Sequence, residues 1–242
     1  MMISTHHNHK GFSLIELMVI MAIGSIVMAG IYTFYQSSLR SHITQQTLVD
    51  MQQDMRAAMY MMTREIRVAG YDPTRDTGAT FLIASSAEVQ FQMDDNRDGD
   101  FDDGGGGNDP DEQVRYVLSN DADGDGVADG TPCNLMRQEW ADAEQVVALN
   151  VDALNIVYFD QDGADLVDPA TGSVPADEIR NIRSVQITIV GRSGTTVPVL
   201  MNSGTDSTSY TNQQGTEILG AQNDEFRRIR LTSEVKVRNM GL

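Results

Sequence analysis

The stretch GFSLIE at residues 11–16 opens an apolar run that continues to Tyr35, and this run decides how the chain is organised. From Phe12 to Tyr35 there are 24 residues, and Glu16 is the only acid or base among them. About 20 apolar residues in a helix cross the hydrocarbon core of a bilayer, so the run predicts a transmembrane helix. A carboxylate within such a span costs about 2.5–3.5 kcal/mol, and by default it marks a functional site.

This opening resembles the amino-terminal signal of type IV prepilins and of type II secretion pseudoprepilins. Gly11, Phe12 and Glu16 stand in that order behind a short polar leader. The resemblance implies that prepilin peptidase cleaves between Gly11 and Phe12 and methylates the new amino terminus on Phe12. It also implies that Glu16 pairs with the amine of a neighbouring subunit during assembly. A carboxylate in lipid is tolerated once a cation neutralises it.

Two other kinds of segment share the apolar run. An uncleaved signal anchor offers no reason for Glu16. A secretory signal peptide has an apolar region of about 7–15 residues before a small-residue cleavage site, whereas this run is longer and continues into an amphipathic helix. We therefore expect a leader over residues 1–11 and a transmembrane and filament-core helix over 12–35. Lys10 before the span favours an amino terminus inside and an exported chain.

Beyond Tyr35 the helix continues with a different periodicity, because apolar side chains recur at steps of three or four. No proline interrupts residues 12–69, and Gly70 followed by Pro73 is a stop signal. We expect residues 36–70 to be the amphipathic half of the same helix, packed on the chain's own globular head. The predicted packing face consists of Leu39, Ile43, Thr47, Met51, Met55, Met59, Met62, Ile66 and Ala69.

The remaining residues, 71–242, predict a β-rich head. Alternating or apolar short segments predict strands at residues 87–93, 113–118, 134–140, 145–151, 154–159, 185–190 and 229–237. The expected fold class is α+β, type IV pilin-like, with one long amino-terminal helix packed on an antiparallel β-sheet. Residues 160–163 predict a hairpin turn. The polar stretch 191–217 predicts a long mobile loop.

Two acidic loops, at residues 94–112 and 120–132, carry most of the net charge of −18. In the second loop, acids at positions one, three, five and nine and a glycine at position six match the front of an EF-hand calcium loop. The predicted ligands are Asp121, Asp123, Asp125, the carbonyl of Val127, and Asp129. Position twelve is Pro132, so the usual bidentate glutamate is absent.

The first loop has a similar layout and is the weaker calcium candidate. Its predicted ligands are Asp94, Asn96, Asp98, Asp100 and Asp102. Position twelve is Gly105, which again lacks the glutamate. The alternative for both loops is a solvated acidic loop without an ion. Calcium at such incomplete sites would bind with dissociation constants of about 10⁻⁴ to 10⁻³ M, as in extracellular modules.

Composition and residue types argue against several other functions. A net charge of −18 argues against direct binding of nucleic acid. The single cysteine, Cys133, excludes an internal disulfide and is expected to be a small buried hydrophobe. A hydrolytic triad or a zinc site would have to use His42, because the other histidines lie in the leader. We therefore expect no enzymatic activity.

The carboxy-terminal segments 180–193 and 226–239 resemble the last strands of PilW-type minor pilins and, in layout, GspJ-type pseudopilins. The resemblance implies a minor pilin-like structural subunit of a type IV pilus, involved in assembly or priming. Its partners would be other pilin subunits, prepilin peptidase and the inner membrane, with the head periplasmic before assembly and the subunit later in an extracellular filament. A pseudopilin of a type II secretion system is one alternative. A membrane-anchored, calcium-dependent binding module is an alternative of another class.

Overall fold

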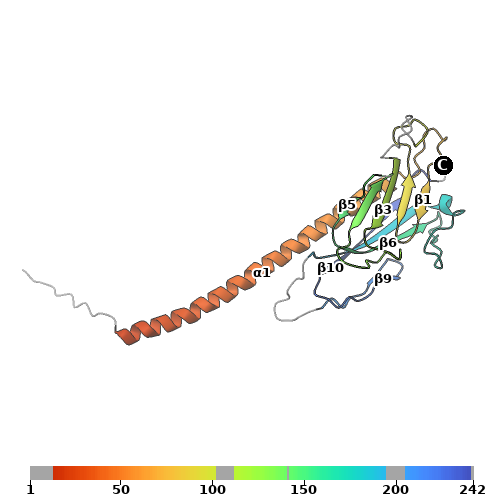
Figure 1. Cartoon of the computed structure of the whole chain (residues 1–242). Helices are drawn as coiled ribbons and strands as arrows, with labels where there is room; N and C mark the ends of the chain where they lie inside the picture. The colour runs from red at the N-terminus through yellow and green to blue at the C-terminus, as the bar shows by residue number, and fades with distance from the viewer. Residues whose placement is uncertain (1–12, 102–111, 141, 195–204, 241–242) are drawn as a thin grey trace, which may run out of the picture. The chain divides into compact units, whose positions relative to one another are not determined.

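The structure is a computed structural model that describes residues 13–101, 112–140, 142–194 and 205–240. Over these residues the chain forms one long helix followed by ten strands (Figure 1). The chain divides into two compact units, residues 1–45 and 46–242. The second unit contains the carboxy-terminal part of the helix and all of the strands.

The helix α1 (Leu14–Ile66) ends four residues before the predicted end at residue 70. The turn that follows α1 is tighter than an α-helical turn. The N–H of Val68 donates to the carbonyl of Glu65 at 3.0 Å, a bond between residues three apart, as in a 3-10 helix. Gly70 then adopts a φ of 74°, which confirms the predicted stop. The N–H of Gly70 donates to the carbonyl of Gln92 at 2.9 Å and so joins the end of the helical segment to a strand.

The strands form three antiparallel sheets. The first has the order β1-β2-β3-β4-β5, with β1 (Phe81–Ala84), β2 (Val89–Gln92), β3 (Gln113–Leu118), β4 (Leu135–Glu139) and β5 (Gln145–Ala148). The second has the order β10-β7-β6, with β6 (Val151–Phe159), β7 (Ser184–Arg192) and β10 (Arg228–Lys236). The third pairs β8 (Tyr210–Thr211) with β9 (Glu217–Leu219). A short 3-10 helix, Ile179–Asn181, precedes β7.

The fold therefore has the predicted α+β class, and several details differ. The pattern misses β1, β8 and β9, because they have only two to four residues and show no useful alternation. The predicted strands 145–151 and 154–159 are divided wrongly, since Asn150 has a φ of 56° and β6 begins right after it. The predicted loop 191–217 is wrong at its ends, which belong to β7, β8 and β9, and its residues 195–204 lie outside the described residues.

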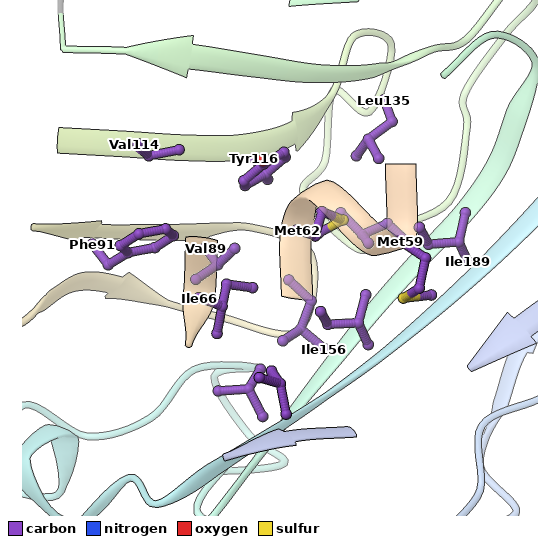
Figure 2. Packing of buried hydrophobic residues seen from close by; sticks show 14 of the residues in the cluster. Met59, Met62, Ile66, Val89, Phe91, Val114, Tyr116, Leu135, Ile156 and Ile189 are labelled. Carbon is purple, nitrogen blue, oxygen red and sulfur yellow. The ribbon is translucent and has the colours of Figure 1, made fainter. Parts of the chain in front are cut away.

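The carboxy-terminal half of α1 forms the centre of the core. Figure 2 shows Met62 and Ile66 between Tyr116 of the first sheet and Ile156 of the second. All four of these side chains are fully buried. Complete burial of such a side chain is worth about 1.5–3 kcal/mol. The methionine face of α1 is therefore packing surface, as predicted.

The packed face of α1 begins later than predicted. Leu39 is 39% exposed and Ile43 is 63% exposed, whereas Met51 is 6% exposed and Met55 is fully buried. The apolar spacing is the same before and after Met51, but only the later residues have strands against them. Periodicity alone thus predicts which face is apolar and not where the packing starts.

A second, smaller cluster covers the other face of the three-stranded sheet. Ala153 of β6 and Val190 of β7 pack with Ile218 and Leu219 of β9. The β8–β9 hairpin therefore shields that face, and β7 is buried along all nine residues. This arrangement leaves β7 as the central strand between α1 and the hairpin.

Candidate functional site: the exposed apolar helix and the two acidic loops

The first candidate site is the start of α1. The N–H of Leu17 donates to the carbonyl of Ser13 at 3.1 Å, so helical bonding begins right behind the predicted processing site. Glu16 is exposed in the first turn, where the helix dipole favours a carboxylate. Gly11 and Phe12 lie outside the described residues, and their cleavage and methylation stay predictions.

Every residue of α1 from Leu14 to Tyr35 is exposed. The large apolar side chains in this segment are 52–77% exposed. The helix contains an 18-residue window with a mean hydropathy of 2.4, and by length and composition it is able to cross a membrane. A monomer in water rarely exposes so continuous an apolar surface, so lipid or another apolar surface must cover it.

Polar contacts hold the other half of the helix to the head. Glu65 of α1 accepts a hydrogen bond from Tyr116 Oη at 2.5 Å and pairs with Arg137 Nε at 3.0 Å. Arg137 also pairs with Glu139. Burial of the phenol, together with the neighbouring Glu65 carboxylate, raises the pKa of Tyr116. Tyr116 therefore stays a hydrogen-bond donor to Glu65.

The first acidic loop brings together only some of the predicted ligands. Asp94, Asp98 and Glu112 each offer one carboxylate oxygen, and the three oxygens lie within 4.8 Å of one another. Asn96 donates through Nδ2 to Asp98 Oδ2 at 2.9 Å, which is a contact inside the loop. Asp100 is absent from the group of three.

The first acidic loop also includes one predicted ligand that is not described and one acid that was not predicted. Asp102 lies outside the described residues. Glu112 was not predicted as a ligand, because it stands 18 positions after Asp94 and fits no EF-hand spacing. The only sequence signal for Glu112 as a ligand is its position just before the predicted strand 113–118. This strand lies antiparallel to the strand that precedes Asp94, so Glu112 comes close to Asp94.

The second acidic loop has a different internal arrangement. Asp121 Oδ1 accepts the N–H of Gly124 at 2.9 Å, and Oδ2 accepts the N–H of Gly126 at 2.9 Å. Burial raises the pKa of Asp121, although these two amide bonds oppose the shift. Carboxylate oxygens of Asp121, Asp123 and Asp129 lie within 4.8 Å of one another. Both oxygens of Asp121 are thus already bonded to the loop's own backbone.

The other predicted ligands of the second loop serve its backbone. Asp125 Oδ1 accepts the N–H of Val127 at 2.7 Å, and Asp125 does not join the group of three. Gly126 has a φ of 83°, and a Cβ there would lie 2.3 Å from the carbonyl of Leu154. The glycine therefore permits both the turn and the close approach to β6. Asp160 caps the predicted hairpin turn by accepting the N–H of Ala164 at 2.8 Å, which confirms that turn.

A buried ionic cluster in the head was not predicted. Asp152 pairs with Arg192 at 3.1 Å and with Arg228 at 2.7 Å, and Arg228 also pairs with Asp224 at 2.6 Å. The hydrogen bond from Arg228 lowers the pKa of Asp224. These pairs link β6, β7 and β10. The sequence signal that could have predicted this cluster is the presence of charged residues inside otherwise apolar strands.

The remaining chemically reactive side chains are placed as follows. Cys133 is 1% exposed in the core, as predicted, and burial raises the pKa of its thiol. His42 is exposed on α1, while the leader histidines lie outside the described residues. Burial and the raised pKa leave Cys133 a packing residue.

Comparisons with known proteins give two family matches. One family model, described as prepilin peptidase-dependent protein B, matches residues 44–206, which is more than half of the chain. The other, the prokaryotic N-terminal methylation motif, matches residues 6–32, a range that includes Gly11, Phe12 and Glu16. No curated protein matches the chain. Among solved structures, a type IV-like pilin from Thermus thermophilus matches with 14% identity and a TM-score of 0.45, covering 79% of this chain and 98% of that one.

Proposed function

The chain belongs to the family of prepilin peptidase-dependent protein B and carries a prokaryotic N-terminal methylation motif, and on this basis we propose that it is a minor pilin-like structural subunit of a type IV pilus. Prepilin peptidase removes residues 1–11 and methylates the amino group of Phe12. The processed subunit then leaves the inner membrane and enters a filament, where it takes part in assembly or priming.

One observation carries this proposal, namely the continuous exposure of α1 from Leu14 to Tyr35. In the precursor, lipid covers this surface while the head faces the periplasm. In a filament, the same surface of neighbouring subunits covers it, so the transfer from lipid to filament keeps the apolar side chains out of water.

Glu16 has a specific place in this proposal. A lone carboxylate among apolar side chains is unfavourable unless a cation pairs with it. Methylation leaves the amino group of Phe12 positively charged, and the amine of one subunit supplies the partner for Glu16 of the next. This pairing would set the axial position of each subunit.

The head has a structural role in this proposal and no enzymatic one. We also propose that calcium binds the second acidic loop through Asp121, Asp123 and Asp129, which is supported by the proximity of their carboxylates. An ion there would stiffen a long loop next to β6. Direct binding of nucleic acid is not part of the proposal, given the net charge of −18.

Two alternatives remain distinct from a minor pilin. A pseudopilin of a type II secretion system would share the leader, Glu16 and the exposed helix half. A membrane-anchored, calcium-dependent binding module would use α1 as an anchor only, and it is favoured by the two acidic loops. The minor pilin and the pseudopilin require cleavage after Gly11, whereas the binding module does not.

The decisive experiment determines the amino terminus. The full-length chain is expressed with and without an active prepilin peptidase, and the intact mass of the product is measured. We expect loss of residues 1–11 and the addition of one methyl group only with the peptidase. An intact precursor beside a control prepilin that is cleaved would overturn the pilin proposal and favour the anchored binding module.

A further inference from the structure

The first acidic loop is closed by the pairing of two strands. Asp94 lies two residues after β2, and Glu112 directly precedes β3. These strands pair antiparallel, with Gln92 opposite Gln113, and the N–H of Met93 donates to the carbonyl of Glu112 at 2.9 Å. The sheet therefore brings the two carboxylates to one place although they are far apart in the sequence.

The burial of these carboxylates is unusual for acids. Asp94 is 0% exposed and Glu112 is 1% exposed. Asp94 Oδ1 accepts the N–H of Arg97 at 2.6 Å, whereas Asp94 Oδ2 is buried and accepts no hydrogen bond from the described residues. Within the described part of the chain, no arginine or lysine forms an ion pair with Asp94. A buried carboxylate oxygen without a partner is costly, so its presence here indicates that a cation binds to Asp94.

We propose that Asp94, Asp98 and Glu112 bind one divalent cation, and that the ion is calcium. Calcium binds oxygen ligands at about 2.3–2.6 Å, so two ligands on opposite sides of one ion lie about 4.6–5.2 Å apart. The three carboxylate oxygens, all within 4.8 Å of one another, satisfy that limit. Magnesium requires about 2.0–2.1 Å and near-ideal octahedral geometry, which suits a site of dispersed carboxylates less well.

Glu112 takes the part that position twelve plays in an EF-hand. Its Oε1 accepts the N–H groups of Asp95 at 3.0 Å and Asn96 at 3.3 Å, which fix the carboxylate beside the loop. The glutamate thus comes from the next strand and not from the end of a twelve-residue loop. The inference deepens the calcium part of the proposed function and is independent of filament assembly.

The position of the ion links three parts of the head. The N–H of Asp94 donates to the carbonyl of Tyr71 at 2.7 Å, and Tyr71 follows the end of α1. An ion on Asp94 and Glu112 would therefore hold the segment after α1 against β2 and β3. Its removal would destabilise the head as a whole, because the buried carboxylates would repel each other.

Calcium binding is measured on the full chain in detergent after treatment with EDTA. Calorimetric titration gives the number of ions, and the fluorescence of Trp140 follows thermal unfolding. We expect Glu112→Gln to bind one calcium ion fewer per chain than the wild type. At about 10 mM calcium, a site with a dissociation constant of 10⁻⁴ to 10⁻³ M lowers the unfolding equilibrium constant about 10- to 100-fold, and this gain should disappear in Glu112→Gln.

Three further variants make the outcome specific. Asp95→Asn removes an exposed charge from the same loop and should keep the ion, as should Asp50→Asn at an exposed acid of α1. Asp98→Asn changes an exposed ligand, so it should fold even if Glu112→Gln does not, and it should weaken calcium binding at least about tenfold. Wild-type stoichiometry and affinity in both Glu112→Gln and Asp98→Asn would overturn the proposal. So would a wild-type chain that binds no calcium at this loop.

Discussion

The two halves of α1 have the same secondary structure and opposite surroundings. From Leu14 to Tyr35 every side chain is exposed, whereas Met55, Met62 and Ile66 are fully buried in the head. Both halves are rich in apolar residues, so composition does not distinguish them. What differs is the partner: the later half has strands of its own chain against it, and the described residues leave the earlier half uncovered. The comparison teaches that one helix joins a surface that packs in the head to an apolar surface that needs lipid or another apolar cover.

The largest expected effect separates assembly from folding. Glu16→Ala should reduce incorporation into filaments more than about tenfold, because it leaves the amine of a neighbouring subunit as an unpaired charge among apolar groups, which costs about 3–5 kcal/mol. The head should unfold as in the wild type, since Glu16 lies outside it. Incorporation is measured by immunoblotting of sheared filaments. Ser25→Ala, which removes a polar group from the same exposed half, is the matched control and should assemble normally.

The next effect compares methionines from the two halves. Met62→Ala should destabilise the head by about 2–5 kcal/mol, because it leaves a cavity in the core. Met28→Ala, at a side chain that is 68% exposed, should change the unfolding free energy by less than about 0.5 kcal/mol. Denaturant unfolding in detergent, followed by Trp140, measures both. Equal losses of stability would mean that the earlier half also packs on the head.

A smaller effect is expected for the polar anchor of the packed half. Glu65→Ala leaves the Tyr116 hydroxyl without its acceptor and Arg137 with one partner fewer, which should cost about 1–3 kcal/mol. Glu65→Gln keeps an acceptor for Tyr116 and should cost less. The same unfolding measurement tests both variants. An Ala variant as stable as the wild type would show that packing alone holds the helix to the sheet.

The smallest effect concerns the turn that follows the packed half. Desolvation opposes ionisation of Asp72, but hydrogen bonds from Thr77, Gly78, Thr74 and Arg75 outweigh it and lower the pKa of Asp72 from 3.8 to about 2. A pKa that is lower in the folded state adds stability above about pH 4, and this contribution is lost as the pH falls from about 4 to about 2.

This pH dependence has its own test. The stability difference between the wild type and Asp72→Asn should therefore shrink across that pH interval. Asp50→Asn, at an exposed acid of α1, is the control for the change of charge. Unfolding curves recorded between pH 2 and pH 6 measure the difference, and a constant gap between the wild type and Asp72→Asn would contradict the assignment.

Local signals predicted the helix and most strands well. The apolar run and the stop at Gly70 gave α1 nearly its observed bounds, because helix periodicity and terminal glycines are properties of neighbouring residues. The alternation at residues 113–118 matches β3 in full. The strands around Asn150 were divided wrongly, because a positive φ at a non-glycine residue leaves little trace in the sequence. The β8–β9 hairpin was missed, because its strands are too short to show a pattern.

The sequence by itself determined the long helix, the α+β class and the acid at the start of the apolar run. These follow from spacing, and spacing acts through residues that are close along the chain. Only the tertiary structure decided where packing on α1 begins and which acids of the first loop gather. Leu39 and Met51 obey the same periodicity, but strands cover only Met51. Glu112 reaches Asp94 because β2 and β3 pair, a contact between residues too far apart in sequence for any local pattern to predict.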